Sequence, residues 1–278
     1  RLFGMAFNID YTVCIILMGV LTGIYVIAGG YMATAINDFV QGCIMLVGIC
    51  AVVGAILNTQ GGFSEALHNL AAVSDSTTTN GDVPGIYASF FGPEPVNLLG
   101  VVLLTSLGTW GLPQMVQKFY AIKSEDAIHK GTVISTIFAL VVSGGCYFMG
   151  GFGRLFSDQV DVATEGYDAI VPTMLSNLPE LLIAIVVILV LSASMSTLSA
   201  LVMTSSSTIT LDLLKGNMVK KMNDFQAVFI IRCFIVVFII ISMVIAIIQY
   251  KYSISFIAQL MGVSWGALAG AFLAPFLY

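Results

Sequence analysis

Charged residues are scarce in this sequence. Asp, Glu, Lys and Arg make up 9% of the 278 residues and hydrophobic residues 58%, whereas a soluble domain carries about 25% charged residues. This composition excludes an ordinary soluble domain, and the net charge of −5 implies no nucleic-acid partner. We therefore expect one transmembrane domain over residues 1–278, embedded in a lipid bilayer.

Reactive and processing motifs are also lacking. The five cysteines lie in apolar segments without C-x-x-C spacing, which argues against disulfides and cysteine-bound metal. No H-E-x-x-H motif occurs, both histidines fall outside the predicted spans, and Asp38 is the one plausible embedded acid, so we expect no enzyme and no catalytic residue. The chain has neither an initiator Met nor a signal peptide, and we expect it to be a piece of a longer protein.

Long apolar runs predict seven membrane spans. They cover about residues 9–30, 34–57, 97–121, 132–152, 179–213, 225–249 and 253–277. The loop at about 58–96 holds acidic residues but no Lys or Arg, while two shorter loops carry lysine clusters. The positive-inside rule places those clusters in the cytoplasm and the 58–96 loop outside. Residue 1 is then outside the cell membrane and residue 278 in the cytoplasm.

The fifth predicted span is rich in hydroxyl groups, although nothing charged lies between Glu180 and Asp212. Ser192, Ser196, Ser199 and Ser206 recur at helical spacing and form one polar stripe. A hydroxyl that donates to the carbonyl one turn earlier keeps lone pairs that a hard cation accepts as ligands. The stripe has no carboxylate, which favours a monovalent ion. Close helix packing by small residues explains the same pattern.

The third predicted span is interrupted near its middle. Gly108, Gly111 and Pro113 break an apolar helix, and because Pro113 has no N–H the carbonyl of Thr109 loses its helical partner. Such breaks are tolerated in a membrane where they line a wet cavity or meet a ligand. Trp110 offers a stacking face at the break. A plain proline kink is the alternative.

Asp38 lies at the inner start of the second predicted span, in the segment AINDFVQG. An acid in that position is either solvated at the helix N-terminus or part of a cation path, since ionisable groups at membrane depth often mark one.

Three segments together resemble the sodium:solute symporter family, nearest its sodium/proline and sodium/pantothenate branch. SASMSTLSALVMTSSSTITLDLLK resembles the sodium-ligand helix, GTWGLPQMVQKFYAIKSEDAI the discontinuous helix, and GGYMATAINDFVQG the Gly-Gly…Asp segment. The resemblance runs along essentially the whole chain. It implies an all-α, LeuT-like fold of two inverted five-helix repeats, in which the seven spans are core helices four to ten.

The resemblance also implies site residues. Ala193, through its carbonyl, and Ser196 and Thr197, through their hydroxyls, match the family's sodium ligands. Asp38 and Ser199 match an ion path or a second sodium, although Ala200 stands where members with a clear second sodium carry Ser.

Ser106, Thr109 and Trp110 match solute-facing positions. Sugar-transporting relatives often have Asn and Tyr in place of Ser106 and Thr109, and a Lys in place of Ala139. The resemblance therefore favours an amino acid or small carboxylate over a sugar.

The function that this resemblance implies is sodium-coupled symport of a small polar organic solute by alternating access. Two alternatives stay open, a proton-coupled or sodium-independent carrier of the same fold and a non-transporting membrane sensor. Ten core helices are needed for the fold and the chain supplies seven, so we expect residues 1–278 alone not to transport.

Overall fold

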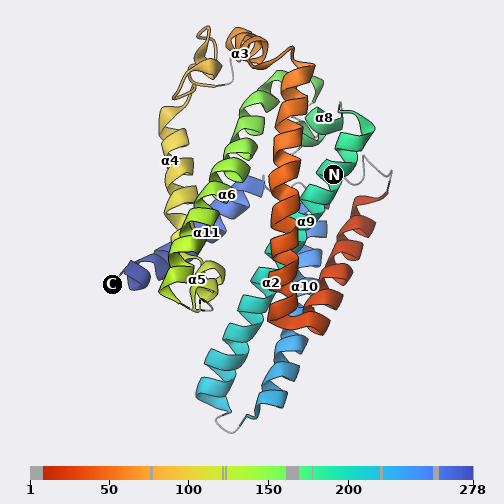
Figure 1. Cartoon of the computed structure of the whole chain (residues 1–278), viewed down its shortest axis with the longest axis vertical. Coiled ribbons are helices and arrows are strands. Elements are labelled where there is room, and N and C mark those ends of the chain that lie inside the picture. The colour runs from red at the N-terminus through yellow and green to blue at the C-terminus, as the bar shows by residue number, and fades with distance from the viewer. Residues whose placement is uncertain are drawn as a thin grey trace. The chain divides into compact units, whose positions relative to one another are not determined.

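Helices make up the regular structure of this chain, and no strand occurs in the part that is described. The computed structural model describes residues 9–75, 78–120, 122, 124–160, 169–176, 178–219, 222–252 and 257–277 (Figure 1). The chain divides into two units. One unit comprises Arg1–Met45 with Val187–Ser255, and the other comprises Leu46–Val186 with Phe256–Tyr278.

The long helices follow the apolar runs of the sequence. In chain order the elements are α2 (Tyr11–Thr59), α3 (Phe63–Ala72), the 3-10 turn η1 (Ile86–Ala88), α4 (Pro95–Ser106), the 3-10 turn η2 (Gly108–Gly111), α5 (Pro113–Phe119), α6 (Glu125–Phe152), the 3-10 segment η3 (Gly153–Gln159), α8 (Ile170–Ser176), α9 (Glu180–Ser207), the π-helix η5 (Thr208–Met218), α10 (Asp224–Tyr252) and α11 (Ile257–Leu277).

Four helical stretches of the described chain are long and apolar enough to cross a membrane. They are Tyr11–Thr59, Glu125–Ser157, Glu180–Met218 and Asp224–Tyr252. Shorter apolar helices lie at Pro95–Gly111 and Leu260–Pro275. The described part of the chain is therefore all-helical, and its long apolar helices are those of a multi-pass membrane protein.

Gly30 divides the longest of these stretches. A straight helix of 49 residues would be about 74 Å long, more than twice the apolar thickness of a bilayer. The backbone of Gly30 leaves the helical region, with φ 60° and ψ −159°, a combination that only glycine adopts readily. The two parts, 11–29 and 31–59, agree with the separate spans predicted at 9–30 and 34–57.

The core of the first unit lies between the start of α2, the second part of α9 and α10. Val26, Val202, Ile235 and Ile239 are buried together, one or two from each helix. Gly23 allows α2 to approach α10, because a Cβ built there would lie 3.2 Å from Ile239 Cδ1. This packing fixes the side of α9 that faces its neighbours.

The second unit has its own small core, made by Ala66 and Leu70 of α3 and Phe152 of α6. Next to it Arg154 forms an ion pair with Asp75 and donates to the Tyr87 hydroxyl at 2.9 Å. The guanidinium also lies over the Tyr87 ring, 4.7 Å from its centroid. These contacts tie the segment after α3 to the segment after α6.

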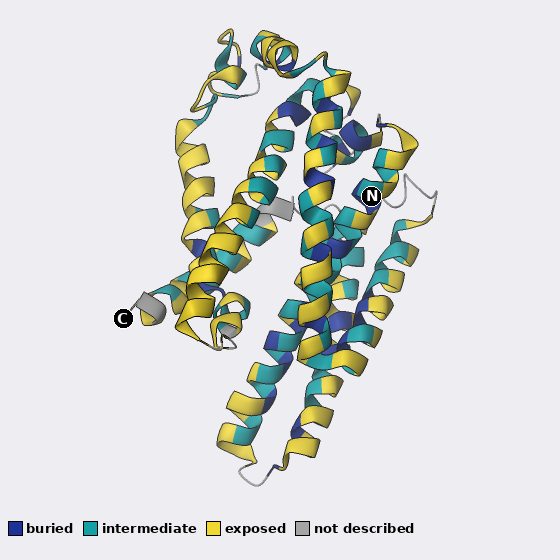
Figure 2. Cartoon of the chain, in the orientation of Figure 1, coloured by how far each residue is buried: buried dark blue, intermediate teal, exposed yellow. Residues whose placement is uncertain are grey.

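Both units carry many exposed positions, drawn in yellow in Figure 2, and many of the exposed residues are large and apolar. On α6, Val133, Ile134, Ile137 and Leu140 are all exposed, and none of its most apolar window is buried. A helix with such a surface is stable in lipid, where exposed hydrocarbon carries no hydration penalty.

Candidate functional site

Four hydroxyl groups of α9 donate back to carbonyls of their own helix, as the sequence predicts: Thr197, Ser199, Ser206 and Ser207. Thr197 Oγ1 donates to the Ala193 carbonyl oxygen at 2.9 Å, and Ser199 Oγ donates to the Ser196 carbonyl oxygen at 2.8 Å. The first bond brings two of the predicted ion ligands into contact. Each oxygen retains a lone pair, so the Ala193–Thr197 pair presents two acceptors from one turn of helix, with Ser196 in the same turn.

The predicted ligands of α9 occupy two different faces. Thr197 is exposed, whereas Ser199 is completely buried. Two positions along an α-helix correspond to a rotation of about 200°. Ser199 therefore does not join Thr197 around one ion. The face that carries Ala193 and the exposed Thr197 is distinct from the buried face that carries Ser199.

A residue that the sequence did not single out lies at the buried face. The Tyr25 hydroxyl, from the first part of α2, donates to the Met195 carbonyl oxygen at 3.1 Å. The same hydroxyl interacts with the side chains of Ser199 and Asn37 and with the charge of Asp38. A tyrosine five residues before Gly30, in a run whose other polar residue is Thr22, was the available signal for it.

Asp38 lies on the second part of α2, about two turns beyond Gly30, and is half-buried. Its charge acts on the Tyr25 hydroxyl, which also interacts with the side chain of Ser199. Both residues were predicted to serve an ion path or a second ion, and they do lie near a common neighbour.

The interrupted span is also observed. α4 ends at Ser106, η2 covers Gly108–Gly111, and α5 begins at Pro113 after the extended Leu112, with φ −82° and ψ 118°. The Thr109 carbonyl, which loses its usual partner to Pro113, accepts from the Leu112 N–H at 3.3 Å. The break is thus a tightened 3-10 turn that keeps this carbonyl paired.

Close contact with α11 holds the break in place. A Cβ built on Gly111 would lie 2.9 Å from Ala269 Cα and 3.2 Å from Leu273 N. Both are backbone atoms that a side chain cannot displace cheaply. Glycine is therefore required at this point for η2 to lie against α11.

The three residues predicted to face the solute come together at this break. Ser106 and Trp110 are exposed, with 59% of Trp110 accessible. Thr109 is half-buried, and its hydroxyl donates to the Ser106 carbonyl oxygen at 2.9 Å. They belong to the second unit of the chain, whereas Ala193, Ser196, Thr197, Ser199 and Asp38 belong to the first.

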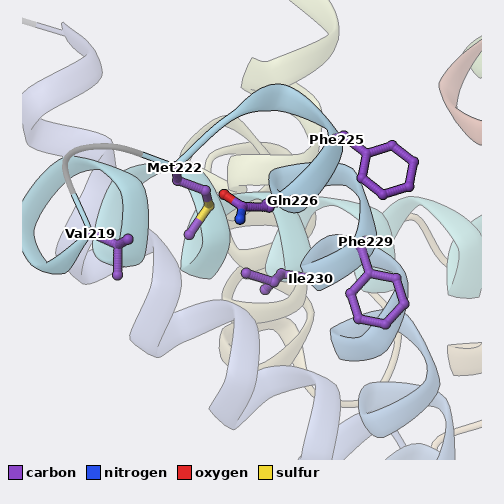
Figure 3. A pocket seen from close by; sticks show the side chains of 6 residues that line it. All are labelled: Val219, Met222, Phe225, Gln226, Phe229 and Ile230. Carbon is purple, nitrogen blue, oxygen red and sulfur yellow. The ribbon is translucent and has the colours of Figure 1, made fainter.

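Two hollows among the described residues lie away from these predicted site residues. One of about 320 Å³ lies at the turn between η5 and α10 (Figure 3) and is lined by Val219, Met222, Phe225, Gln226, Phe229 and Ile230. Gln226 is its one polar side chain, and its Oε1 accepts from the Asn223 N–H at 3.2 Å in a helix cap. A groove of about 440 Å³ between α2 and α10 has an apolar lining. Both surfaces suit lipid chains rather than a polar solute.

The described residues contain no group of three or more His, Cys, Asp or Glu side chains able to hold a metal ion. Beyond Glu180 at its start, the oxygens available on α9 are neutral carbonyls and hydroxyls. Such a set suits a monovalent cation better than a divalent one, because it supplies no compensating charge.

Comparison with known proteins points to one family. The family model described as "Sodium:solute symporter family" matches residues 1–278. The chain is 28% identical to the sodium/pantothenate symporter of Haemophilus influenzae, over 77% of the chain and 42% of the relative.

Two further relatives are named for proline. The osmoregulated proline transporter OpuE of Bacillus subtilis is 25% identical over 98% of the chain and 53% of the relative. The sodium/proline symporter of Staphylococcus aureus is 28% identical over 88% and 47%. The chain thus spans about half the length of the curated relatives it matches.

Proposed function

The chain belongs to the sodium:solute symporter family, and from this membership we propose that the protein carrying it uses inward sodium flow to drive uptake of a small polar organic solute. The family and the matched relatives are transporters rather than enzymes.

The oxygen pair on α9 carries this proposal. Sodium binds the Ala193 carbonyl oxygen and the hydroxyl oxygens of Ser196 and Thr197. The 2.9 Å bond between Thr197 Oγ1 and the Ala193 oxygen keeps both within reach of one ion. The exposed position of Thr197 leaves that side of the turn open to an ion and to further ligands.

The solute binds at the break between α4 and α5. Trp110 supplies an exposed ring for the apolar part of the solute, and Ser106 and Thr109 supply hydroxyls for its polar part. The names of the matched relatives mention pantothenate and proline, both of which carry a carboxylate. We propose an amino acid or small carboxylate as the solute.

The fold is LeuT-like, with core helices four to ten in this chain. Two features support it. Gly30 splits the longest helix into two spans, and the discontinuous α4–α5 segment has the form that such transporters place at the substrate site. Sodium and solute stabilise the same arrangement of the two repeats, so the binding of one raises the affinity for the other. Loss of sodium inside the cell then favours the other arrangement and release of the solute, which is alternating access.

Asp38 and Ser199 serve the ion on its way to the cytoplasm or hold a second sodium. They lie away from the exposed Thr197 face and close to Tyr25. A carboxylate at this depth attracts a cation that has left its first ligands.

Uptake of a panel of labelled solutes by cells expressing the full-length protein, in sodium and in choline medium, tests the function. We expect at least one carboxylate-bearing solute to enter faster in sodium than in choline. Uptake that is equal in the two media would favour the sodium-independent carrier of the same fold.

A further inference from the structure

We propose that Tyr25 is a positioning residue for the ion, whose hydroxyl holds the ligand-bearing turn of α9 in register with the Asp38 segment of α2. This inference rests on the proposed sodium-coupled function and deepens it.

The contact lies between residues far apart in the sequence. Tyr25 and Met195 are 170 positions apart, and their bond is 3.1 Å long. The Met195 carbonyl belongs to the residue directly before Ser196 and two before Thr197. Restraint of this carbonyl therefore restrains the rotation of the turn that presents both ligand hydroxyls.

The kink at Gly30 makes the second half of the contact possible. In a straight helix, Tyr25 and Asn37 would be about 18 Å apart, since each residue adds 1.5 Å. The non-helical backbone of Gly30 interrupts the helix between them, and the Asn37 side chain and the charge of Asp38 act on the Tyr25 hydroxyl. One hydroxyl thus contacts α9 and both parts of α2.

The chemistry of the phenol suits this double role. A tyrosine hydroxyl donates one hydrogen and accepts through its lone pairs, and a backbone carbonyl accepts two hydrogen bonds. The Met195 oxygen can therefore accept from Tyr25 without losing its helical partner. The Tyr25 oxygen keeps its lone pairs for a donor such as the Asn37 amide.

The packing role of the Tyr25 ring can be tested separately from the positioning role of its hydroxyl. The Tyr25 ring packs against the buried cluster of Val26, Val202, Ile235 and Ile239. Phenylalanine keeps the ring and removes only the hydroxyl. Tyr25→Phe therefore tests the hydrogen bonds without a large cavity.

The experiment measures uptake by the full-length protein as a function of sodium. We expect Tyr25→Phe to raise the sodium concentration for half-maximal uptake about threefold to tenfold, the loss expected for one hydrogen bond. The KM for solute at saturating sodium should stay unchanged. Tyr31→Phe removes an exposed hydroxyl from the same helix and should leave both values at the wild-type level.

Coupling to Asp38 gives an independent readout. In the double variant Tyr25→Phe, Asp38→Asn, the increase in the sodium requirement should be smaller than the product of the two single increases, because the residues act together. Fully multiplicative effects would overturn the link to Asp38.

If a variant is produced in low yield, a second measurement on purified protein replaces the uptake assay. Sodium raises the thermal midpoint of a protein that binds it, and the sodium concentration that gives half of this shift should rise in Tyr25→Phe. A lower midpoint with an unchanged sodium requirement would reduce Tyr25 to a packing residue. Absence of sodium dependence in the wild type would instead overturn the proposed function.

Discussion

Thr197 and Thr132 make the same local hydrogen bond in different surroundings. Each hydroxyl donates to the carbonyl oxygen four residues earlier at 2.9 Å, Thr197 on α9 and Thr132 on α6. This bond satisfies a hydroxyl in any membrane helix, so the bond alone does not define an ion site. Both helices carry further hydroxyls within the same turn, Ser196 on α9 and Ser135 and Thr136 on α6. The feature that distinguishes Thr197 is its position in the middle of a long charge-free run, whereas Lys130 lies two residues before Thr132.

Alanine at Thr197 or Ser196 is therefore expected to raise the sodium concentration needed for half-maximal uptake, by about tenfold if one ion ligand is lost. Thr132→Ala removes the same back-bond from α6 and should leave the sodium dependence unchanged. Sodium titration of uptake in the three variants is the measurement. Equal curves for all three and the wild type would remove the assignment of the ligands.

Trp110 is the residue at the break that has most surface to offer a solute. We expect Trp110→Ala to weaken solute binding by about tenfold, since an aromatic stacking contact contributes roughly 0.5–1.5 kcal/mol beyond its buried area and the apolar area covered by the solute adds to this. The quantity to measure is the KM for solute at saturating sodium, together with the amount of protein in the membrane.

Phe119→Ala provides the control, because Phe119 is a similarly exposed aromatic residue on the following helix. A Trp110→Ala protein with normal KM and only a reduced yield would show that the ring serves packing.

At the scale of elements, two interruptions shape the chain, and each depends on glycine. Gly111 has no room for a side chain beside the backbone of α11, whereas Gly30 has open space around it but a positive φ. The first interruption is thus maintained by packing and the second by backbone conformation. Without these interruptions, one helix would run on through the segment that carries Asp38, and another through the segment that carries Trp110.

Gly30→Ala is expected to lower the stability of the full-length protein by about 1–3 kcal/mol, the cost of holding a non-glycine residue in this region of φ and ψ. Gly54→Ala, on the same helix with nothing within 4 Å, should be neutral or stabilising by up to about 1 kcal/mol. Thermal unfolding in detergent compares the two. A Gly30→Ala protein as stable as the wild type would mean that α2 is not kinked there.

The features that depend on neighbouring residues in the chain could be predicted from the sequence. Gly108, Gly111 and Pro113 break their helix by covalent geometry, and the back-bonds of Thr197 and Ser199 follow from helical spacing. The Tyr25–Met195 bond was not predictable, because it joins residues 170 positions apart and depends on how α2 packs on α9. Nor did composition predict that η5 would continue α9 as a π-helix.

At the scale of the whole molecule, the exposed apolar surface indicates that the helices lie in a membrane, and the distribution of charge predicts their orientation in it. The exposed apolar faces of α6 and α10 indicate that the helices lie in lipid, but they carry no direction across the bilayer. Direction depends on the lysine-rich segments, among them the one that carries Lys215, Lys220 and Lys221. The orientation with residue 1 outside and residue 278 in the cytoplasm therefore stays a prediction.

Single cysteines introduced into a variant whose five native cysteines are replaced by serine test this orientation. In intact cells a membrane-impermeant thiol reagent should label Thr79→Cys, in the 58–96 loop, and should label Met218→Cys only after permeabilisation. Both positions are exposed in the structure, so burial does not limit the reaction. The reverse labelling pattern would invert the topology.

Sodium-driven accumulation is the most direct measurement of symport. Purified full-length protein is placed in liposomes with an inward sodium gradient, and the internal concentration of a transported solute is followed over time. Symport predicts a transient accumulation above the external concentration, lost when sodium is equal on both sides and reduced at limiting sodium in Thr197→Ala. Solute that only equilibrates across the membrane, at the same rate with and without the gradient, would contradict sodium-coupled transport by this protein.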